Sequence, residues 1–405
     1  MAQTTPSPAI TEKISRIQNA LREQGIDGWL FYDFWKRNEF AQRILEFPTY
    51  LLNTRRFFYL IPASGEPRKL VHSIERGNLD HLPGSRTIFL SWRSLEDGLK
   101  ALLAGMKTVA MEYSPGNAIP TISKVDAGTV ETVRQTGVDV VSSMNLAQHF
   151  ESRWSEEAYY DNLDTAKGLR STVNKTFQFM RERIRSRQTL TEYDVQQFML
   201  EQFRQNDLVT MESPNCSVNA NSGNPHYEPT KDIHSELHEG DFVLIDLWAK
   251  KKKPGATFND ITWVGFLGET VPEKFTKVFD VVKGARDAAV DFVRSSFASG
   301  KSIRGCDIDD VARAYISARG YAEQFIHRTG HSITEDLHGS GANLDNLETR
   351  DERLIIPETG FSVEPGIYFM GEFGIRSEVN VYISKNRDVI VPGEPRQQEV
   401  VAILR

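Results

Sequence analysis

The stretch Asp241-Phe242-Val243-Leu244-Ile245-Asp246-Leu247-Trp248 decides the fold. It is apolar on both faces, which predicts a strand that is buried on both sides. Asp246 interrupts this run, and the first basic residue after it is Lys250. An ionised carboxylate in such a place costs several kcal/mol unless a positive charge compensates it. The strand therefore predicts a partner cation.

A second acid follows on the next predicted strand, Phe258–Val264, which carries Asp260 near its start. The two strands would form a hairpin. Lys250–Lys253 lies between them and is followed by Pro254-Gly255, so we interpret this basic segment as a solvated tip. Two carboxylates on one hairpin repel each other, and one or two bound divalent cations would hold both ionised.

The totals narrow the class of protein. The chain has 405 residues, which favours two or three domains, and at 40% hydrophobic and 25% charged residues it is typical of a soluble globular protein. The formal charge of −7 argues against a nucleic-acid partner. Two cysteines favour a reducing compartment, and we see neither a secretory signal nor a membrane-length apolar run. We therefore expect a cytoplasmic protein with no membrane partner.

Element patterns divide the chain. We expect a loose tail over residues 1–9, then a small α/β domain over 10–153 in which helices and strands alternate. Residues 154–405 begin with a charged helical region, 156–185, that could be two helices broken near Ser171. A further helix begins after Thr191 as its cap, and the last ninety residues are mostly strands and turns. The predicted class is α+β.

Three more groups downstream could carry chemistry. The segment 325–338 holds three histidines, and Glu364 ends a short strand before Pro365-Gly366. In 374–381 a period of two places Arg376, Glu378 and Asn380 on one face. Two Asp, two Glu and one His would hold two divalent ions, which at neutral pH can bind a hydroxide and polarise a carbonyl. This oxygen-rich, thiolate-free set favours Mn, Co or Zn.

The order of these residues resembles the pita-bread metallopeptidases, the group of Xaa-Pro dipeptidase (prolidase), aminopeptidase P and methionine aminopeptidase. Each motif is weak alone, but together in the family's order they are specific. They are Ile245-Asp246, Asp260-Ile261-Thr262, the histidine string, Val363–Tyr368 and Gly374–Glu378. The resemblance covers the second half of the chain. The first half resembles the creatinase-type N-terminal domain, which methionine aminopeptidases lack.

The resemblance implies a role for each position. Asp246 would chelate one metal, Asp260 and Glu378 would bridge both, and His331 and Glu364 would bind the other. Glu364 would also shuttle a proton from a metal-bridging hydroxide to the leaving nitrogen. The remaining implied catalytic residues contact or brace the substrate site: His226, His327, His338 and Arg376.

The implied function is hydrolysis of small peptides with proline at the second position. Two divalent ions would serve it, with Mn preferred and Co or Zn as alternatives, in a homodimer. We expect a dipeptidase. The alternatives are an aminopeptidase P acting on longer peptides and a non-catalytic pita-bread peptide-binding protein. A metal-free, creatinase-like hydrolase is disfavoured because all five ligand positions are filled.

Purely structural roles stay open for individual residues. His327 could only hydrogen-bond a neighbour, and Arg376 could be a structural partner of Glu378. The sequence also departs from the family pattern where glycines are usual, at Arg328 and Thr334. Both would add bulk at the substrate pocket, so the peptide preference is the most open part of the assignment.

Overall fold

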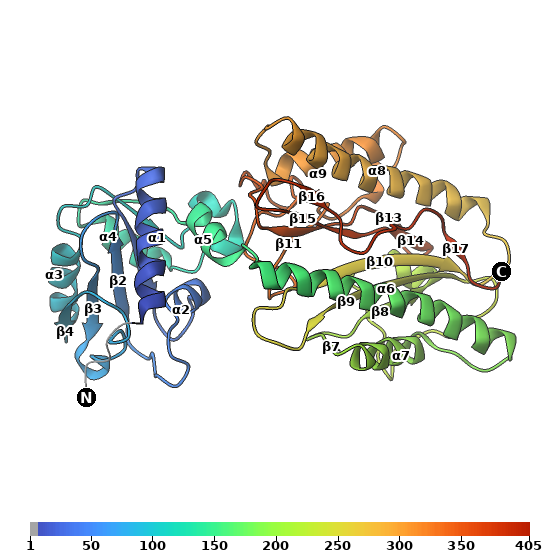
Figure 1. The fold of residues 1–405 in the computed structure, drawn as a ribbon, viewed down its shortest axis with the longest axis horizontal. Coiled ribbons are helices and arrows are strands. Elements are labelled where there is room, and N and C mark those ends of the chain that lie inside the picture. The colour runs from blue at the N-terminus through green and yellow to red at the C-terminus, as the bar shows by residue number, and fades with distance from the viewer. Residues whose placement is uncertain (1–6) are drawn as a thin grey trace. The chain divides into compact units, whose positions relative to one another are not determined.

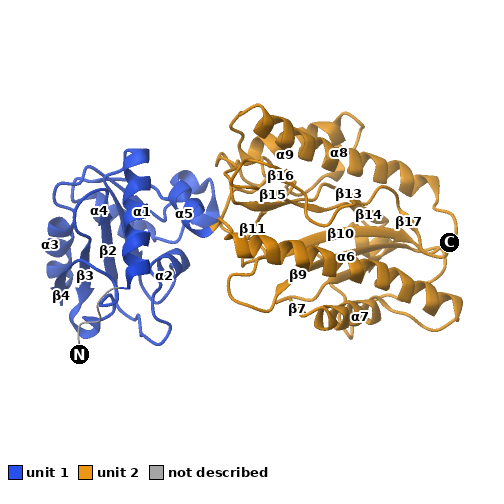
Figure 2. Cartoon of the chain, in the orientation of Figure 1, with its two compact units in different colours: residues 1–151 blue, residues 152–405 orange. Residues whose placement is uncertain are grey.

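A computed structural model describes residues 7–405. The chain divides into two compact units, Met1–Glu151 and Ser152–Arg405 (Figure 2). The division falls two residues before the predicted boundary. No helix in the described part of the chain is long and apolar enough to cross a lipid bilayer.

The first unit is a six-stranded sheet in the order β4-β3-β2-β1-β5-β6, with helices packed on it (Figure 1). β2 is antiparallel to both its neighbours, and the other pairs are parallel. Its strands are β1 Gly28–Asp33, β2 Phe57–Pro62, β3 Arg68–His72, β4 Ser85–Phe89, β5 Thr108–Met111 and β6 Asp139–Ser142. Its helices are α1 Pro8–Gln24, α2 Glu39–Ile44, α3 Trp92–Leu102, α4 Ala127–Arg134 and α5 Met144–Glu151.

The predicted tail was partly wrong. Helix α1 begins at Pro8, and the hydroxyl of Ser7 accepts a hydrogen bond of 3.2 Å from the Ile10 amide. Serine at the N-cap and proline at the first helical position are both favourable there, so the helix begins two residues earlier than expected. Residues 1–6 of the predicted tail lie outside the described residues.

The second unit contains two larger sheets and a hairpin between helices. Figure 1 shows α6 and α7 on one side of the strands and α8 and α9 on the other. The helices are α6 Glu156–Arg185, α7 Glu192–Gln205, α8 Glu273–Ala298 and α9 Gly305–Ser317. The strands are β7 Leu208–Val209, β8 Asn215–Val218, β9 Phe242–Lys251, β10 Asn259–Phe266, β11 Ser332–Ile333, β12 Gly360–Val363, β13 Gly366–Phe369, β14 Phe373–Arg376, β15 Val379–Ile383, β16 Val389–Ile390 and β17 Val401–Ala402.

Three sheets are built from these strands. One has the order β17-β10-β9-β7, with β8 also paired to β9. The second has the order β11-β12-β15-β16, and the third is the hairpin β13-β14. The long helix α6 packs against β9 and β10, and α8 packs against α9 and β14. The arrangement agrees with the expected α+β class.

The predicted break in the long helix near Ser171 was wrong, because α6 is one helix of 30 residues. The neighbouring Thr172 and Val173 are fully buried, and the Thr172 hydroxyl donates a 3.0 Å hydrogen bond to the carbonyl of Gly168 one turn earlier. Packing of this face against the sheet outweighs the weak helix propensities of serine, threonine and glycine.

Strand β9 is buried on both sides, as its sequence predicts. Val243, Ile245 and Leu247 belong to the apolar cluster with α6 and α7, while Phe242 and Leu244 belong to the cluster with α8. Because side chains alternate along a strand, Asp246 shares the face of Phe242 and Leu244. The acid therefore lies on the face of the sheet that looks toward the second sheet and away from α6.

Candidate active site

The pairing of β9 with β10 places both aspartates on one face. The strands are antiparallel, with Thr262 opposite Asp246 and Asp260 opposite Trp248. Asp260 is therefore two positions along from the partner of Asp246, and the acids are diagonal neighbours. This register explains how two carboxylates of one hairpin reach the same cavity.

His331 and Glu364 come from a second strand pair. His331 immediately precedes β11, and its amide donates a 2.9 Å hydrogen bond to the hydroxyl of Ser362 in β12. A Cβ at Gly330 would lie 2.0 Å from the Ser362 carbonyl oxygen, so only glycine allows this approach. Glu364 follows β12, where its amide donates to the carbonyl of Thr329 at 2.8 Å.

The expected continuous strand over 374–381, which would carry Glu378, is interrupted in the structure. β14 ends at Arg376 and β15 begins at Val379, so Glu378 lies in the break between two strands. Arg376, Glu378 and Asn380 nevertheless all contact β10. Arg376 Nε and Glu378 Oε2 lie 2.9 and 2.8 Å from the Thr262 hydroxyl, and Asn380 Oδ1 accepts from the Asp260 amide at 2.9 Å.

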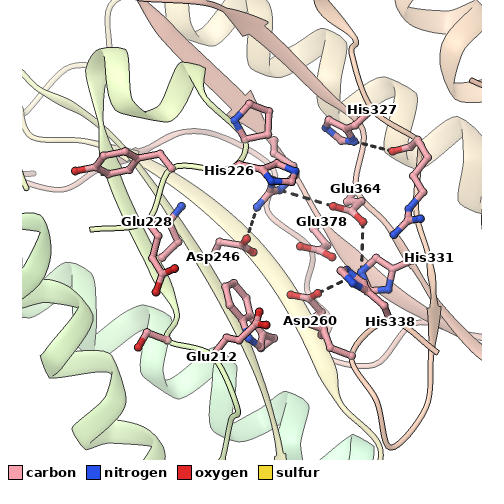
Figure 3. A pocket seen from close by; sticks show the side chains of 18 of the residues that line it. Glu212, His226, Glu228, Asp246, Asp260, His327, His331, His338, Glu364 and Glu378 are labelled. Atoms are coloured by element: carbon pink, nitrogen blue, oxygen red, sulfur yellow. Dashed lines mark hydrogen bonds and ion pairs between the residues drawn. The ribbon is translucent and has the colours of Figure 1, made fainter. Parts of the chain in front are cut away.

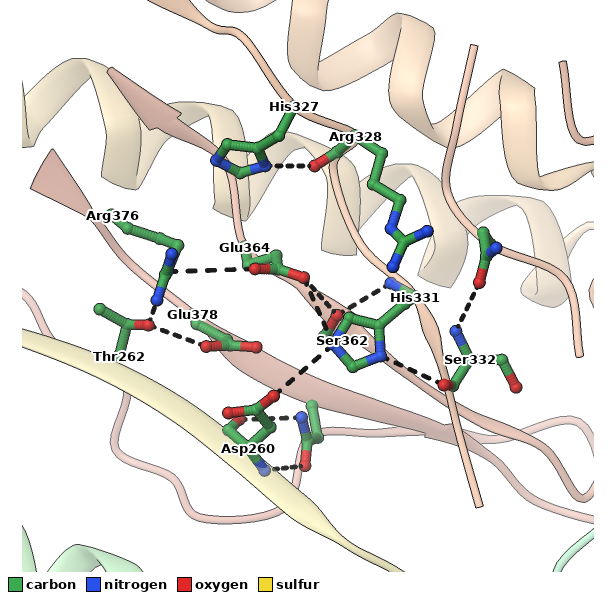
Figure 4. Close-up of polar contacts among 12 residues, drawn as sticks. Asp260, Thr262, His327, Arg328, His331, Ser332, Ser362, Glu364, Arg376 and Glu378 are labelled. Atoms are coloured by element: carbon green, nitrogen blue, oxygen red, sulfur yellow. Dashed lines mark hydrogen bonds and ion pairs between the residues drawn. The ribbon is translucent and has the colours of Figure 1, made fainter. Parts of the chain in front are cut away.

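Three of the five predicted ligands form a tight group. One ligand atom each from Asp260, His331 and Glu378 lies within 4.8 Å of the others, and all three side chains are buried (Figure 4). His331 Nδ1 donates to the Ser332 carbonyl at 3.2 Å, which leaves Nε2 with its lone pair facing the acids. Nε2 lies 3.6 Å from Asp260 Oδ2 and 3.5 Å from Glu364 Oε1, which is too long for a hydrogen bond.

The chemistry of this group fits a cation. Among the described residues, Asp260 Oδ1 and Glu378 Oε1 are buried oxygens without a hydrogen-bond partner. Burial, with the charges of nearby carboxylates, raises the pKa of Asp260 and of Glu378 well above the usual carboxyl range. A divalent ion would satisfy both oxygens and the imidazole nitrogen together, and this donor set is typical of Mn, Co or Zn.

Asp246, unlike Asp260 and Glu378, has protein partners for its carboxylate oxygens. Its carboxylate accepts from the guanidinium of Arg376 in a close ion pair and from the Thr262 hydroxyl at 2.8 Å. Burial raises the pKa of Asp246, although the charge of Arg376 opposes the rise. The structure thus places Asp246 at the cavity but outside the group of Asp260, His331 and Glu378. Among the described residues, Arg376 forms its ion pairs with Asp246 and Glu364, and not with Glu378, its expected structural partner.

The pKa of Glu364 is lowered, in contrast to the raised pKa values of Asp260 and Glu378. Burial alone would raise its pKa, but the charges of His331, Arg376 and His327 outweigh that effect and hold the pKa below its usual value. Ser362 Oγ donates to Glu364 Oε1 at 3.0 Å, and Arg376 Nε is 4.0 Å from Oε2. A carboxylate that stays ionised beside the cavity can accept a proton during a reaction.

The three other predicted histidines differ in their surroundings. His327 has both ring nitrogens engaged, Nδ1 with the Arg328 carbonyl at 2.7 Å and Nε2 with the Tyr368 hydroxyl at 2.9 Å. The His338 ring lies edge-on to His331 with the ring centroids 4.4 Å apart. His226 is exposed on the loop after β8, with its side chain toward the cavity (Figure 3). Burial lowers the pKa of His327 to about 4.

All nine predicted site residues line one cavity of about 400 Å³. Sequence reasoning missed other residues of its wall, including Glu212, Glu228 and Trp248, and the hydrogen-bonding roles of Thr262 and Tyr368. The sequence did contain a signal for Thr262, because it lies two positions after Asp260 and so shares its face of the strand.

Arg328 lines the cavity as expected. Thr334 does not, and its hydroxyl accepts from the Asp336 amide at 3.1 Å within the loop.

Comparisons with known proteins agree with this geometry. The model of metallopeptidase family M24 matches residues 167–385, more than half of the chain. A putative Xaa-Pro aminopeptidase of Mycoplasma pneumoniae is 28% identical over 44% of this chain and 46% of its own length. An Xaa-Pro dipeptidase of Lactobacillus delbrueckii subsp. lactis is 30% identical over 39% of this chain and 38% of its own. The chain thus matches less than half the length of these curated relatives.

Solved structures resemble the chain over almost its whole length. The dipeptidase PepE of Mycobacterium ulcerans gives a TM-score of 0.71 at 18% identity, with 98% of this chain and 100% of that chain covered. An Xaa-Pro dipeptidase of Bacillus anthracis gives 0.64 at 17% identity, with 97% and 99% covered. These similarities establish the prolidase-type fold of both units. Taken with the family match and the arrangement of Asp260, His331 and Glu378, they show that this chain belongs to metallopeptidase family M24.

Proposed function

We propose that the protein is a dinuclear metal-dependent exopeptidase that hydrolyses Xaa-Pro bonds, and in particular Xaa-Pro dipeptides. One observation carries the proposal. The buried oxygens Asp260 Oδ1 and Glu378 Oε1 have no partner among the described residues, and one ligand atom each of Asp260, Glu378 and His331 lies within 4.8 Å of the others. Curated relatives named as Xaa-Pro dipeptidases and aminopeptidases support the substrate class.

Each residue of the site would have a distinct role in metal binding or catalysis. Asp260, His331, Glu364 and Glu378, together with Asp246, would hold the two cations, which would supply Lewis-acid chemistry to a scissile carbonyl and to water. Glu364 would accept a proton from the attacking water and return it to the leaving nitrogen, because its pKa is held low and Oε1 faces the cavity. Arg376 would hold Asp246 in place, and His338 and His226 would contact the peptide.

His327 fits a supporting role in this scheme. Both its ring nitrogens are engaged, so it would orient the Tyr368 hydroxyl, which lies 3.5 Å from Arg376 Nη1. This role replaces direct contact with substrate for that histidine. Mn remains the preferred metal, with Co or Zn as alternatives.

The direct test joins elemental analysis to a peptide assay. Protein loaded with Mn, Co or Zn is expected to bind two ions and to cleave an Xaa-Pro dipeptide, and Asp260→Ala or Glu364→Ala is expected to abolish turnover. Asp291→Ala on the exposed face of α8 is the matched control, because its side chain is 70% exposed and far along the helix. A folded, metal-loaded protein inactive on every Xaa-Pro peptide would refute the proposal.

Two alternatives have their own outcomes. An aminopeptidase P would cleave longer Xaa-Pro peptides better than dipeptides in a length series. A non-catalytic peptide-binding protein would hold no metal by elemental analysis.

We also propose that residues 10–153 and 154–405 are the N-terminal and catalytic domains of a cytoplasmic homodimer. Light scattering during size-exclusion chromatography measures the assembly state.

A further inference from the structure

Arg328 is an unpaired cation in the wall of the active-site cavity. It is half-buried, and its backbone carbonyl accepts from His327 Nδ1. Within residues 7–405 its guanidinium forms neither an ion pair nor a hydrogen bond. The other arginine of the wall, Arg376, has Asp246 as its partner. Arg328 is therefore the cation of this cavity whose charge the described residues leave unmatched.

Two other arginines of the second unit with little exposure are paired with acids, whereas the half-buried Arg170 covers the Trp263 ring and its Nη1 has no hydrogen-bond partner among the described residues. Arg313 forms an ion pair of 2.9 Å with Asp309, and Arg353 forms one of 2.6 Å with Asp351. A partly desolvated guanidinium is costly without an anion, so the usual solution is an acid of the same fold. No acid among residues 7–405 pairs with Arg328, and the free space beside it is the cavity where a ligand would bind.

The side chain of Arg328 is directed toward the reacting groups. Figure 4 shows its guanidinium extending from the His327 segment toward His331. Its positive charge is close enough to contribute to the lowered pKa of both His331 and His338. Burial first, and then the charges of His331 and Arg328, lower the pKa of His338 to about 4. An anion bound by Arg328 would therefore lie beside His331 and His338.

Acids mark another part of the same cavity. Glu228 lies on the loop that carries His226, and Figure 3 shows Glu228 on the side of Asp246 that is away from His331. The wall acids Glu212, Glu228 and Glu348 form no ion pair with Arg328 or with any other described cation. The cavity thus offers the carboxylate of Glu228 to an amine in one part and the guanidinium of Arg328 to a carboxylate in another.

We propose that Arg328 binds the free α-carboxylate of the substrate on the leaving-group side, and so makes the enzyme a dipeptidase. This inference rests on the proposed peptidase function. In a dipeptide the ammonium and carboxylate groups are one residue on either side of the scissile bond, which matches a cavity with Glu228 in one part and Arg328 in another. Arginine stays ionised at all working pH values and forms two parallel hydrogen bonds to a carboxylate.

The test compares substrates that differ only in the carboxylate. We expect the metal-loaded protein to cleave Ala-Pro with a kcat/KM about 10- to 100-fold above that for Ala-Pro-NH2, as for one charge-assisted contact. Arg328→Met should lower kcat/KM for the dipeptide by that factor more than for the amide, chiefly through KM. Arg328→Lys should restore part of the preference. Equal losses on both substrates would overturn the proposal.

Three controls decide whether the effect belongs to the charge of Arg328. Arg319→Met removes an arginine outside the cavity, whose guanidinium covers the Tyr315 ring, and should leave the preference intact. Unfolding temperatures show whether Arg328→Met folds, which we expect because the guanidinium makes no bond within the described chain. The peptide Ala-Pro-Glu-NH2 carries its carboxylate on a side chain, and a preference for it over Ala-Pro would overturn the α-carboxylate assignment.

Failure of the proposed function is distinguishable from failure of this inference. If the protein cleaves neither substrate, the peptidase proposal fails. Titration calorimetry of Ala-Pro and Ala-Pro-NH2 against the metal-loaded protein and Arg328→Met then decides the role of Arg328 separately. Tighter binding of the dipeptide that Arg328→Met removes would support it. Equal binding of the two ligands, or binding of neither, would overturn it.

Discussion

Asp246 and Thr262 face each other across the β9–β10 pair, and the Thr262 hydroxyl lies 2.8 Å from Asp246 Oδ1. The same hydroxyl lies 2.8 Å from Glu378 Oε2 and 2.9 Å from the Nε of Arg376, which donates to it. A hydroxyl has one proton and can donate to only one of the two carboxylates. The other short contact needs a proton on the carboxyl group, and the raised pKa of Glu378 makes it the group that holds one in the metal-free protein.

Thr262→Val is expected to destabilise the protein, because it removes the one group that joins Asp246, Glu378 and Arg376. Leaving buried polar groups without a partner should lower the free energy of unfolding by about 1–3 kcal/mol. Urea unfolding monitored by circular dichroism measures this. Thr276→Val on α8 removes a hydroxyl that donates to the Glu273 carbonyl, and should change the free energy of unfolding by about 0.5 kcal/mol or less. Equal stabilities for the two variants would contradict the bridging role.

Glu378→Gln is expected to stabilise the metal-free protein while removing metal binding. Burial and then Asp260 raise the pKa of Glu378 above its ordinary value of 4.5. The stability that this carboxyl contributes is present below pH 4.5 and is lost as the pH rises through its folded pKa. The variant should therefore exceed the wild type by about 1 kcal/mol at pH 8 and by less at pH 5.

Urea unfolding of chelator-treated protein at both pH values measures the effect of Glu378→Gln, and calorimetric titration with Mn measures the loss of metal. Glu372→Gln, an exposed acid in the β13–β14 turn, is the matched control and should do neither. A Glu378→Gln protein that is less stable than the wild type at pH 8 would show that the carboxylate is not a source of repulsion.

Protonation of His327 is expected to lower the stability as the pH drops below 6.5, while the raised pKa of Glu378 acts in the opposite direction. Burial lowers the folded pKa of His327 from 6.5 to about 4, so its contribution is present above pH 6.5 and is lost as the pH falls toward 4. Between pH 7.5 and pH 5 this one group should account for about 1–2 kcal/mol. His327→Asn does not titrate and should show a smaller drop in urea unfolding. An equal drop in both proteins would place the effect elsewhere.

Glu192→Gln is expected to loosen the loop that carries His226. The buried Glu192 carboxylate, at the start of α7, accepts from the amides of Val218 and Ser235 at 2.7 Å each and from the Tyr227 hydroxyl. A glutamine would turn an amide group toward these donors, which should cost about 2 kcal/mol. We expect faster proteolysis within residues 219–237 and a higher KM.

The control for this substitution lies on the same helix. Glu201→Gln changes an exposed acid of α7 that bonds Arg204 and Gln205, and should leave both proteolysis and KM as in the wild type. If Glu192→Gln lowers stability but leaves the KM and the cleavage pattern unchanged, then Glu192 supports the fold without positioning the loop.

Several elements follow directly from local sequence. The predicted cap at Thr191 is present, with its hydroxyl accepting from the Asp194 amide at 3.1 Å. The run from Phe242 to Trp248 is the buried strand that its apolar pattern predicts. The false break near Ser171 came from local propensity, which packing against β9 and β10 overrode.

By itself, the sequence determined which residue types could bind metal, the two strands that carry Asp246 and Asp260, and the family that the order of the residues resembles. These are properties of short segments, set by alternation, turn residues and side-chain chemistry. Only the tertiary structure decided which atoms meet. Asp260, His331 and Glu378 converge from separate strand pairs, whereas Asp246 contacts Arg376, 130 residues away. Register and long-range packing set those positions, and neither is encoded within any one segment.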